Sequence, residues 1–222
     1  MKIKHIWLFI TSLLLYTGNA VSQDSLLIKK KKGLKVFSLR LGIDLFKPIK
    51  TNFEDDFKGL EIVGDLKINR RVYIAAELGS EKKSQQTEQI NFTTNGSYIK
   101  LGVDYNFFNN WKGMDNSLFV GIRLSNSIHK HSVNEYTLYE NYSAVDFKNT
   151  YFERATIKEG LLIGEREQLN SSWIEVLFGT KVEVLKNFYI GASIRLHRLL
   201  NNSQPRNFGN LYAPGFNKIV DD

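Results

Sequence analysis

The stretch Ile99-Lys-Leu-Gly-Val-Asp-Tyr-Asn-Phe107 alternates between apolar residues and polar or small residues over its whole length. This alternation has the period of a β-strand, in which successive side chains point to opposite faces of the sheet. The stretch therefore predicts a strand with one oily face and one face that carries Lys100, Gly102 and Asp104. A strand of roughly ten residues is long enough to cross a bilayer at a tilt.

The same pattern recurs along the chain, so the sequence predicts seven amphipathic strands. They occupy residues 37–45, 60–68, 72–79, 99–107, 118–125, 174–184 and 188–197. The 222 residues are 42% hydrophobic, which is too polar for a bundle of membrane helices but suits strands that are apolar on one face only. We therefore predict an all-β fold, an antiparallel up-and-down transmembrane β-barrel of about eight strands.

The polar face of the predicted strands carries a nearly balanced set of charges. Because an unpaired buried charge is costly, this balance favours an enclosed network inside the barrel. Glycines recur on the same face and leave room for long side chains. The predicted network consists of Arg40, Asp44, Glu61, Asp65, Lys67, Glu77, Lys100, Asp104, Arg123, Glu175, Lys181, Glu183 and Arg195.

The opposite face carries no charge in any of the seven strands, and we expect it to face lipid. Aromatic residues near the strand ends, Trp173 among them, are typical of membrane interfaces. The residues predicted to face lipid include Leu39, Leu41, Ile43, Ile62, Ile74, Leu101, Val103, Val120, Ile122, Val176, Phe178, Ile190 and Ile194.

Short and long links alternate between the predicted strands. Residues 69–71 and 185–187 form short links, whereas residues 47–59, 80–97 and 126–172 form long ones. Outer-membrane barrels have short periplasmic turns and long extracellular loops. The Tyr-rich loop 126–172 is the segment best suited to recognise an extracellular ligand, although it could simply extend a hairpin.

The N-terminus reads as a secretory signal over residues 1–22, with Lys2 and Lys4 before the apolar run from Ile6 to Tyr16. We expect a basic tether over residues 23–34 and the barrel over residues 35–222. The absence of cysteine excludes disulfides and a lipidated cysteine. Lys218 to Asp222 could begin an eighth strand. Either the rest of that strand is missing from this sequence, which we expect, or another segment closes the sheet.

Three stretches carry a resemblance to a known family: Lys58-Gly-Leu-Glu-Ile-Val-Gly-Asp65, Gly96-Ser-Tyr-Ile-Lys-Leu-Gly-Val-Asp-Tyr-Asn106 and Asn210-Leu-Tyr-Ala-Pro-Gly-Phe-Asn217. Across roughly residues 34–217 the chain resembles a family of uncharacterised exported proteins from Bacteroidota. The resemblance implies an outer-membrane β-barrel with no assigned activity. It also implies one more apolar strand, which is where this sequence departs from the family.

Catalytic and metal-binding signals are weak. His129 and His131 could offer two metal ligands, but no Cys or spaced carboxylate accompanies them. Ser193 and His197 share a strand face but lie about 13 Å apart along it, too far for direct proton transfer. No phosphate-binding glycine loop and no HExxH or GxSxG motif occurs. We expect no enzyme activity and no cofactor.

Three functions remain open from the sequence. The first is a non-enzymatic outer-membrane barrel that is structural or recognises ligands, with outer-membrane lipid as its partner. The second is a secreted soluble barrel that binds a small apolar ligand inside, and the third is an outer-membrane enzyme that modifies lipid. The run of four lysines from Lys29 to Lys32 lacks interleaved aromatic residues, so we expect no nucleic-acid partner.

Overall fold

The computed structural model describes residues 38–87, 89–110, 115–141, 152–157, 164–204 and 209–219. The predicted signal segment 1–22 and tether 23–34 lie outside these residues. The elements in chain order are β1 (Ser38–Ile43), α2 (Phe46–Phe53), β2 (Phe57–Lys67), β3 (Val72–Gln86), β4 (Ile90–Asn106), β5 (Ser117–Asn141), β6 (Phe152–Ile157), β7 (Gly164–Leu185), β8 (Phe188–Asn202), β9 (Tyr212–Ala213) and β10 (Asn217–Lys218). The predicted all-β class is confirmed.

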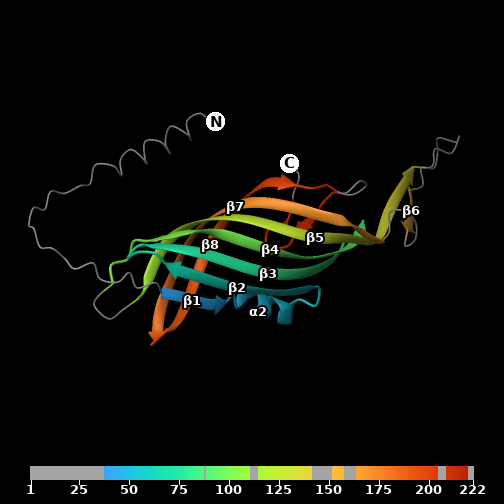
Figure 1. The fold of residues 1–222 in the computed structure, drawn as a ribbon. Helices are drawn as coiled ribbons and strands as arrows, with labels where there is room; N and C mark the ends of the chain where they lie inside the picture. The colour runs from blue at the N-terminus through green and yellow to red at the C-terminus, as the bar shows by residue number, and fades with distance from the viewer. Residues whose placement is uncertain are drawn as a thin grey trace, which may run out of the picture. The chain divides into compact units, whose positions relative to one another are not determined.

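One antiparallel sheet contains most of the chain, in the order β1-β2-β3-β4-β5-β7-β8, and β6 pairs with β5 (Figure 1). No pairing joins β1 to β8 among the described residues, so the closed barrel that the sequence predicts is not found. The reason is the number of strands in the path. Since each neighbour along it is antiparallel to the last, the first and seventh strands run in the same direction and cannot close the sheet as an antiparallel pair.

The sheet curls until its distant strands exchange side-chain contacts. Lys181 on β7 places Nζ 2.6 Å from a carboxylate oxygen of Asp65 on β2. The guanidinium of Arg40 on β1 lies 5.2 Å from the centre of the Tyr189 ring on β8. Side chains from the two edges of the sheet therefore meet over its concave face.

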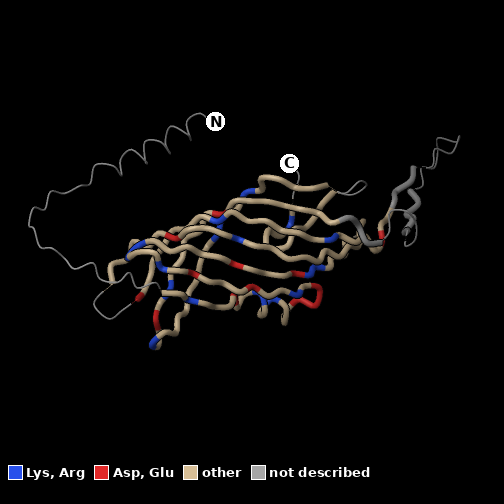
Figure 2. The backbone as a smooth tube through the Cα atoms, viewed as in Figure 1, with Lys and Arg blue, Asp and Glu red and all other residues tan. Residues whose placement is uncertain are grey.

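The concave face is polar and buried, and the convex face is apolar and exposed. Lys100 on β4 is 4% exposed, whereas its neighbour Leu101 is 51% exposed. Acidic and basic residues are interspersed along the central strands (Figure 2). This arrangement inverts that of a water-soluble protein, in which apolar side chains form the buried core.

Several strands extend beyond the apolar segments, which the sequence did not predict. The predicted long link 80–97 is a hairpin, because β3 and β4 remain paired from Ser80 opposite Ser97 to Gln86 opposite Asn91. Most of the described part of the predicted loop 126–172 is likewise strand, in β5, β6 and β7. Backbone pairing continues there although neither face is continuously apolar, so the hydrophobic pattern stops before the strands do.

The predicted link 47–59 contains the helix α2. Pro48 sits in its first turn, where a missing backbone N–H costs nothing because those N–H groups have no helical acceptor. Thr51 Oγ1 accepts a hydrogen bond from the backbone N–H of Gly59 at 2.9 Å. The helix thus covers the edge of β2 beyond the end of β1.

Within residues 209–219 the chain forms a small hairpin, β9–β10, which is a separate two-stranded sheet. Lys218 pairs with Tyr212, so it does not begin the predicted eighth strand of the large sheet, and residues 220–222 lie outside the described residues. The hairpin buries Ala213, Phe216 and Ile219 in a cluster with Tyr98 and Trp173. Trp173 is fully buried in this cluster, so its predicted place in an interfacial girdle is also wrong. Trp173 lies on the inner side of the sheet, where apolar residues of the C-terminal hairpin such as Phe216 cover its ring.

Candidate functional site

A cluster of three carboxylates around Lys100 occupies the centre of the concave face. Lys100 Nζ lies 3.5 Å from Glu61, 3.6 Å from Glu77 and 3.3 Å from Glu175. These residues come from β2, β3, β4 and β7, and all four are almost fully buried. One cation therefore links carboxylates from strands on both halves of the curled sheet.

Two arginines compensate the remaining negative charge of this cluster. Arg123 on β5 donates from Nε to Glu77 at 3.1 Å and from Nη1 to Asp104 at 2.6 Å. Arg195 on β8 donates from Nη1 to Glu77 at 2.6 Å and to Glu175 at 3.2 Å. Glu77 is thus shared by three cations, and the buried charges are paired as a low-dielectric interior requires.

A second group of charges lies near the short-turn end of the sheet. Asp65 accepts hydrogen bonds from Arg40 Nε at 2.7 Å and from Lys181 Nζ at 2.6 Å. Lys67 donates to Asp115, which precedes β5, at 2.7 Å. Together with Tyr189, whose hydroxyl lies 3.4 Å from Asp115, these contacts bring β1, β2, β7 and β8 together.

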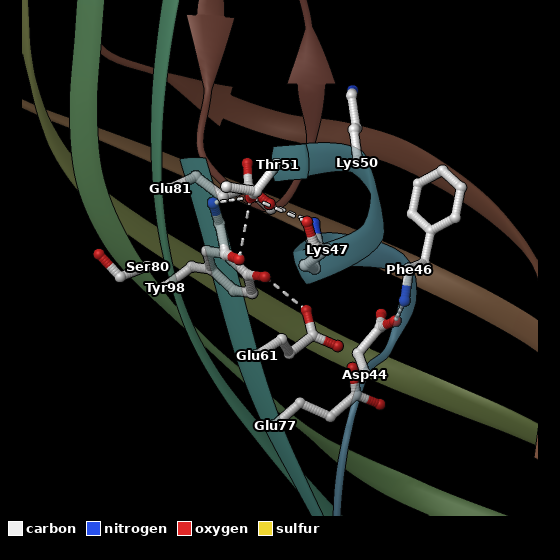
Figure 3. A network of polar contacts seen from close by, with 12 residues as sticks. Asp44, Phe46, Lys47, Lys50, Thr51, Glu61, Glu77, Ser80, Glu81 and Tyr98 are labelled. Atoms are coloured by element: carbon white, nitrogen blue, oxygen red, sulfur yellow. Dashed lines mark hydrogen bonds and ion pairs between the residues drawn. The ribbon is translucent and has the colours of Figure 1, made fainter. Parts of the chain in front are cut away.

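Glu81 on β3 joins the sheet to α2 and to the C-terminal hairpin (Figure 3). One carboxylate oxygen pairs with Lys47 of α2. The other accepts hydrogen bonds from the hydroxyl of Tyr212 at 2.8 Å and from the backbone N–H of Gly215 at 3.0 Å. Burial of the Tyr212 side chain raises its pKa most, and the neighbouring Glu81 carboxylate raises that pKa further. The Tyr212 hydroxyl therefore keeps its proton and remains a hydrogen-bond donor.

Polar side chains also hold the start of the C-terminal segment. The Asn210 amide lies 3.0 Å from His129 Nε2, 3.3 Å from Ser171 Oγ and 2.7 Å from Asn202 Oδ1. His131 Nδ1 lies 2.8 Å from Thr94 Oγ1 on β4. Both histidines are buried on the inner face of β5, so neither belongs to a solvated loop.

The model of a domain of unknown function, DUF6048, matches residues 2–222. The chain belongs to the DUF6048 family. No curated protein and no solved structure matches it.

The DUF6048 chain brings most of the predicted charged residues into ion pairs, with two exceptions. Asp44 accepts a hydrogen bond from the backbone N–H of Phe46 at 2.7 Å, at the start of α2. Glu183 accepts one from the backbone N–H of Asn187 in the β7–β8 turn at 2.9 Å. The residues that do form ion pairs are Arg40, Glu61, Asp65, Lys67, Glu77, Lys100, Asp104, Arg123, Glu175, Lys181 and Arg195.

The residues expected to face lipid are exposed on the convex side of the DUF6048 sheet. Their exposed fractions run from 42% at Val120 to 75% at Leu41 and Ile194. The set is Leu39, Leu41, Ile43, Ile62, Ile74, Leu101, Val103, Val120, Ile122, Val176, Phe178, Ile190 and Ile194.

Sequence reasoning missed Glu81, Lys47 and Asp115. Glu81 continues the alternation that runs through Glu77 and Gly79, and this signal could have extended the third strand. Nothing local marks Lys47 or Asp115, because each acquires its partner only when distant segments fold together. Lys47 and Glu81 are 34 positions apart, and Lys67 and Asp115 are 48 apart.

The DUF6048 chain does not assemble the weak catalytic candidates. Ser193 Oγ lies 3.5 Å from Arg195 Nε, and the His197 ring packs edge-on against Phe216 with ring centres 4.6 Å apart. Among the described residues, no group of three His, Cys, Asp or Glu side chains could hold a metal ion. No helix in this part of the chain is long and apolar enough to cross a membrane.

Proposed function

We propose that this protein is a non-enzymatic outer-membrane protein whose sheet forms the wall of a small transmembrane β-barrel. The observation that carries the proposal is the inverted burial of the two faces. Glu77, Lys100 and Arg123 are nearly inaccessible, whereas Leu101, Ile122 and Ile194 are at least half exposed. Water would favour the reverse arrangement, while acyl chains favour this one.

The height of the apolar band supports a bilayer-spanning wall. Along β4 and into the residue that follows it, the outward side chains towards the short-turn end are Ile99, Leu101, Val103, Tyr105 and Phe107. This span of about nine residues fits a tilted transmembrane strand, and its aromatic end fits a membrane interface. At the other end, Ser97 and Asn95 take the outward positions.

Barrel closure in this proposal needs one strand between β8 and β1. Because β1 and β8 run in the same direction, a single strand antiparallel to both completes an even-numbered cylinder. The contacts of Arg40 with Tyr189 and of Arg195 with Glu77 support a sheet curled far enough for one strand to bridge it. An eight-stranded barrel has an interior that side chains can fill, as the ion pairs do here.

The proposed role is structural or recognitive, with outer-membrane lipid as the partner. The hairpins of β3–β4 and β5–β7 extend past the apolar band on the side of the long links, which we assign to the cell exterior. Their polar surfaces could contact an extracellular ligand. A soluble carrier of an apolar ligand would need an oily cavity inside. The centre of the described interior carries paired charges, and its apolar cluster is filled by residues of the C-terminal hairpin.

The proposal is tested by folding the chain without residues 1–22 into detergent micelles. We expect heat-modifiable migration on a denaturing gel, and in cells we expect extraction from the envelope only by detergent. A freely soluble monomer that migrates identically before and after heating would contradict the proposal.

A further inference from the structure

A row of lysines crosses the outer surface of the sheet just above the apolar band. Lys58 on β2 is directly opposite Lys82 on β3, Lys82 is opposite Asn95 on β4, and Asn95 is opposite Lys130 on β5. All four residues are exposed. We call Lys58, Lys82 and Lys130 the lysine row. Since neighbouring strands lie about 4.8 Å apart, its positive charges are concentrated on one short stretch of the wall.

The pairing of Lys58 with Lys82 is unfavourable in the isolated protein, because like charges directly opposite each other destabilise a sheet. Neither lysine has an ion-pair partner in the described part of the chain. The carboxylates nearby have other partners: Glu54 and Asp56 pair with Lys83, and Glu81 pairs with Lys47. Lys58 and Lys82 are therefore left available to an external anion.

An apolar groove lies directly below the lysine row, one outward position closer to the band. The apolar walls of the groove are formed by Leu60, Ile62 and Leu78. The groove is shallow and open at Ser80 and Ser97, which face each other across β3 and β4. Its volume is about 300 Å³, and Gly79 and Tyr98 complete its lining. Ser80 and Glu81 point to opposite sides of β3, which places the groove outside and the carboxylate inside (Figure 3).

We propose that this surface binds one anionic, phosphate-bearing membrane lipid, with the phosphate on the lysine row and an acyl chain in the groove. The inference rests on the proposed outer-membrane location and deepens it. Ammonium groups attract phosphate as point charges, and basic residues beside an apolar band recognise anionic lipid headgroups. The bound phosphate would also relieve the repulsion between Lys58 and Lys82.

The test compares two variants that lose the same charge at opposite ends of the sheet. Lys58→Gln/Lys82→Gln removes two cations from the lysine row, and Arg70→Gln/Lys186→Gln removes two exposed cations from the short turns. Each protein is folded in micelles of a neutral detergent, and the phosphatidylglycerol that it retains is measured by native mass spectrometry. We expect about tenfold weaker retention for the lysine variant and wild-type retention for the turn variant.

Two further measurements separate a lipid from a free anion. Ser97→Phe fills the groove without changing charge, and it should also weaken phosphatidylglycerol retention. Inorganic phosphate should compete poorly, because it lacks the chain. Full competition by phosphate together with an unchanged Ser97→Phe variant would show a site for phosphate alone and would overturn the proposal, as would equal losses in the lysine and turn variants.

The wild-type protein supplies an independent measurement if a variant fails to fold. Raising the ionic strength should abolish the preference for phosphatidylglycerol over phosphatidylcholine, because the lysine row is exposed and screened by salt. If the protein shows no preference for phosphatidylglycerol at low salt, the inference is wrong. Heat-modifiable migration of the same preparation distinguishes the two claims. If the protein migrates in a heat-modifiable way but shows no lipid preference, only the lipid site is contradicted. If the migration is not heat-modifiable, the proposed function itself is contradicted.

Discussion

Arg195 on β8 places Nη1 2.6 Å from Glu77 Oε2 on β3, across the concave face and between residues 118 positions apart in sequence. The same Glu77 carboxylate pairs with Arg123 and Lys100. Glu77 therefore has more cationic partners than any other carboxylate of the described network. We therefore expect the stability of the curled sheet to depend on Glu77.

Replacing Glu77 by Ala should destabilise the folded protein by about 3–5 kcal/mol, because it leaves buried cations without their partner. Urea unfolding in detergent micelles measures the loss. The control is Asp55→Asn, which removes an exposed carboxylate from the link before β2. A loss of less than about 1 kcal/mol for Glu77→Ala, the value of a surface ion pair, would show that the network does not stabilise the curled sheet.

Glu81→Gln should release the C-terminal hairpin. The substitution removes the charge that pairs with Lys47 and weakens the hydrogen bonds from Tyr212 and the Gly215 backbone. Limited trypsin digestion followed by mass spectrometry should show faster cleavage after Lys218, which is exposed in β10. Ser80→Ala, one position away on the outer side, should leave the cleavage rate unchanged, and equal rates in wild type and Glu81→Gln would refute the anchoring role.

Gly215→Ala should destabilise the hairpin by roughly 1–3 kcal/mol. Gly215 has φ +81°, and an added Cβ would lie 2.6 Å from the Tyr98 ring. Gly42→Ala is the matched control, because its Cβ would meet only Val63, at 3.4 Å. Thermal unfolding should distinguish the two variants; identical midpoints would mean that the hairpin does not pack against Tyr98 as described.

Leu101→Arg should hinder insertion into a bilayer, at a cost of about 2–4 kcal/mol if the position lies near the midplane. Asn95→Arg lies on the same strand and the same outward face, but above the apolar band, and should have little effect. Folding yields into lipid vesicles measure both. An improved yield of soluble folded Leu101→Arg would indicate that the convex face meets water.

The sequence predicts the strands and their two faces because both depend on local alternation. Lys100 and Leu101 take opposite faces in any regular strand, whatever surrounds them. Three features of the structure could not be predicted from local alternation. The polar continuations of β3 and β5 carry no oily stripe, α2 occupies a segment that reads as a link, and the C-terminal hairpin is held by contacts such as Tyr212 to Glu81, 131 positions apart. These depend on where distant segments meet, which no local pattern encodes.

Site-specific spin labels test most directly which face of the sheet points towards lipid. The chain contains no cysteine, so Val103→Cys and Asp104→Cys each give a single attachment site. In protein folded into lipid vesicles, we predict that the label at residue 103 is accessible to oxygen and shielded from a water-soluble nickel complex. The label at residue 104 should be poorly accessible to oxygen from the lipid. A label at residue 103 that the nickel complex reaches freely would contradict the outward, lipid-facing orientation on which the account rests.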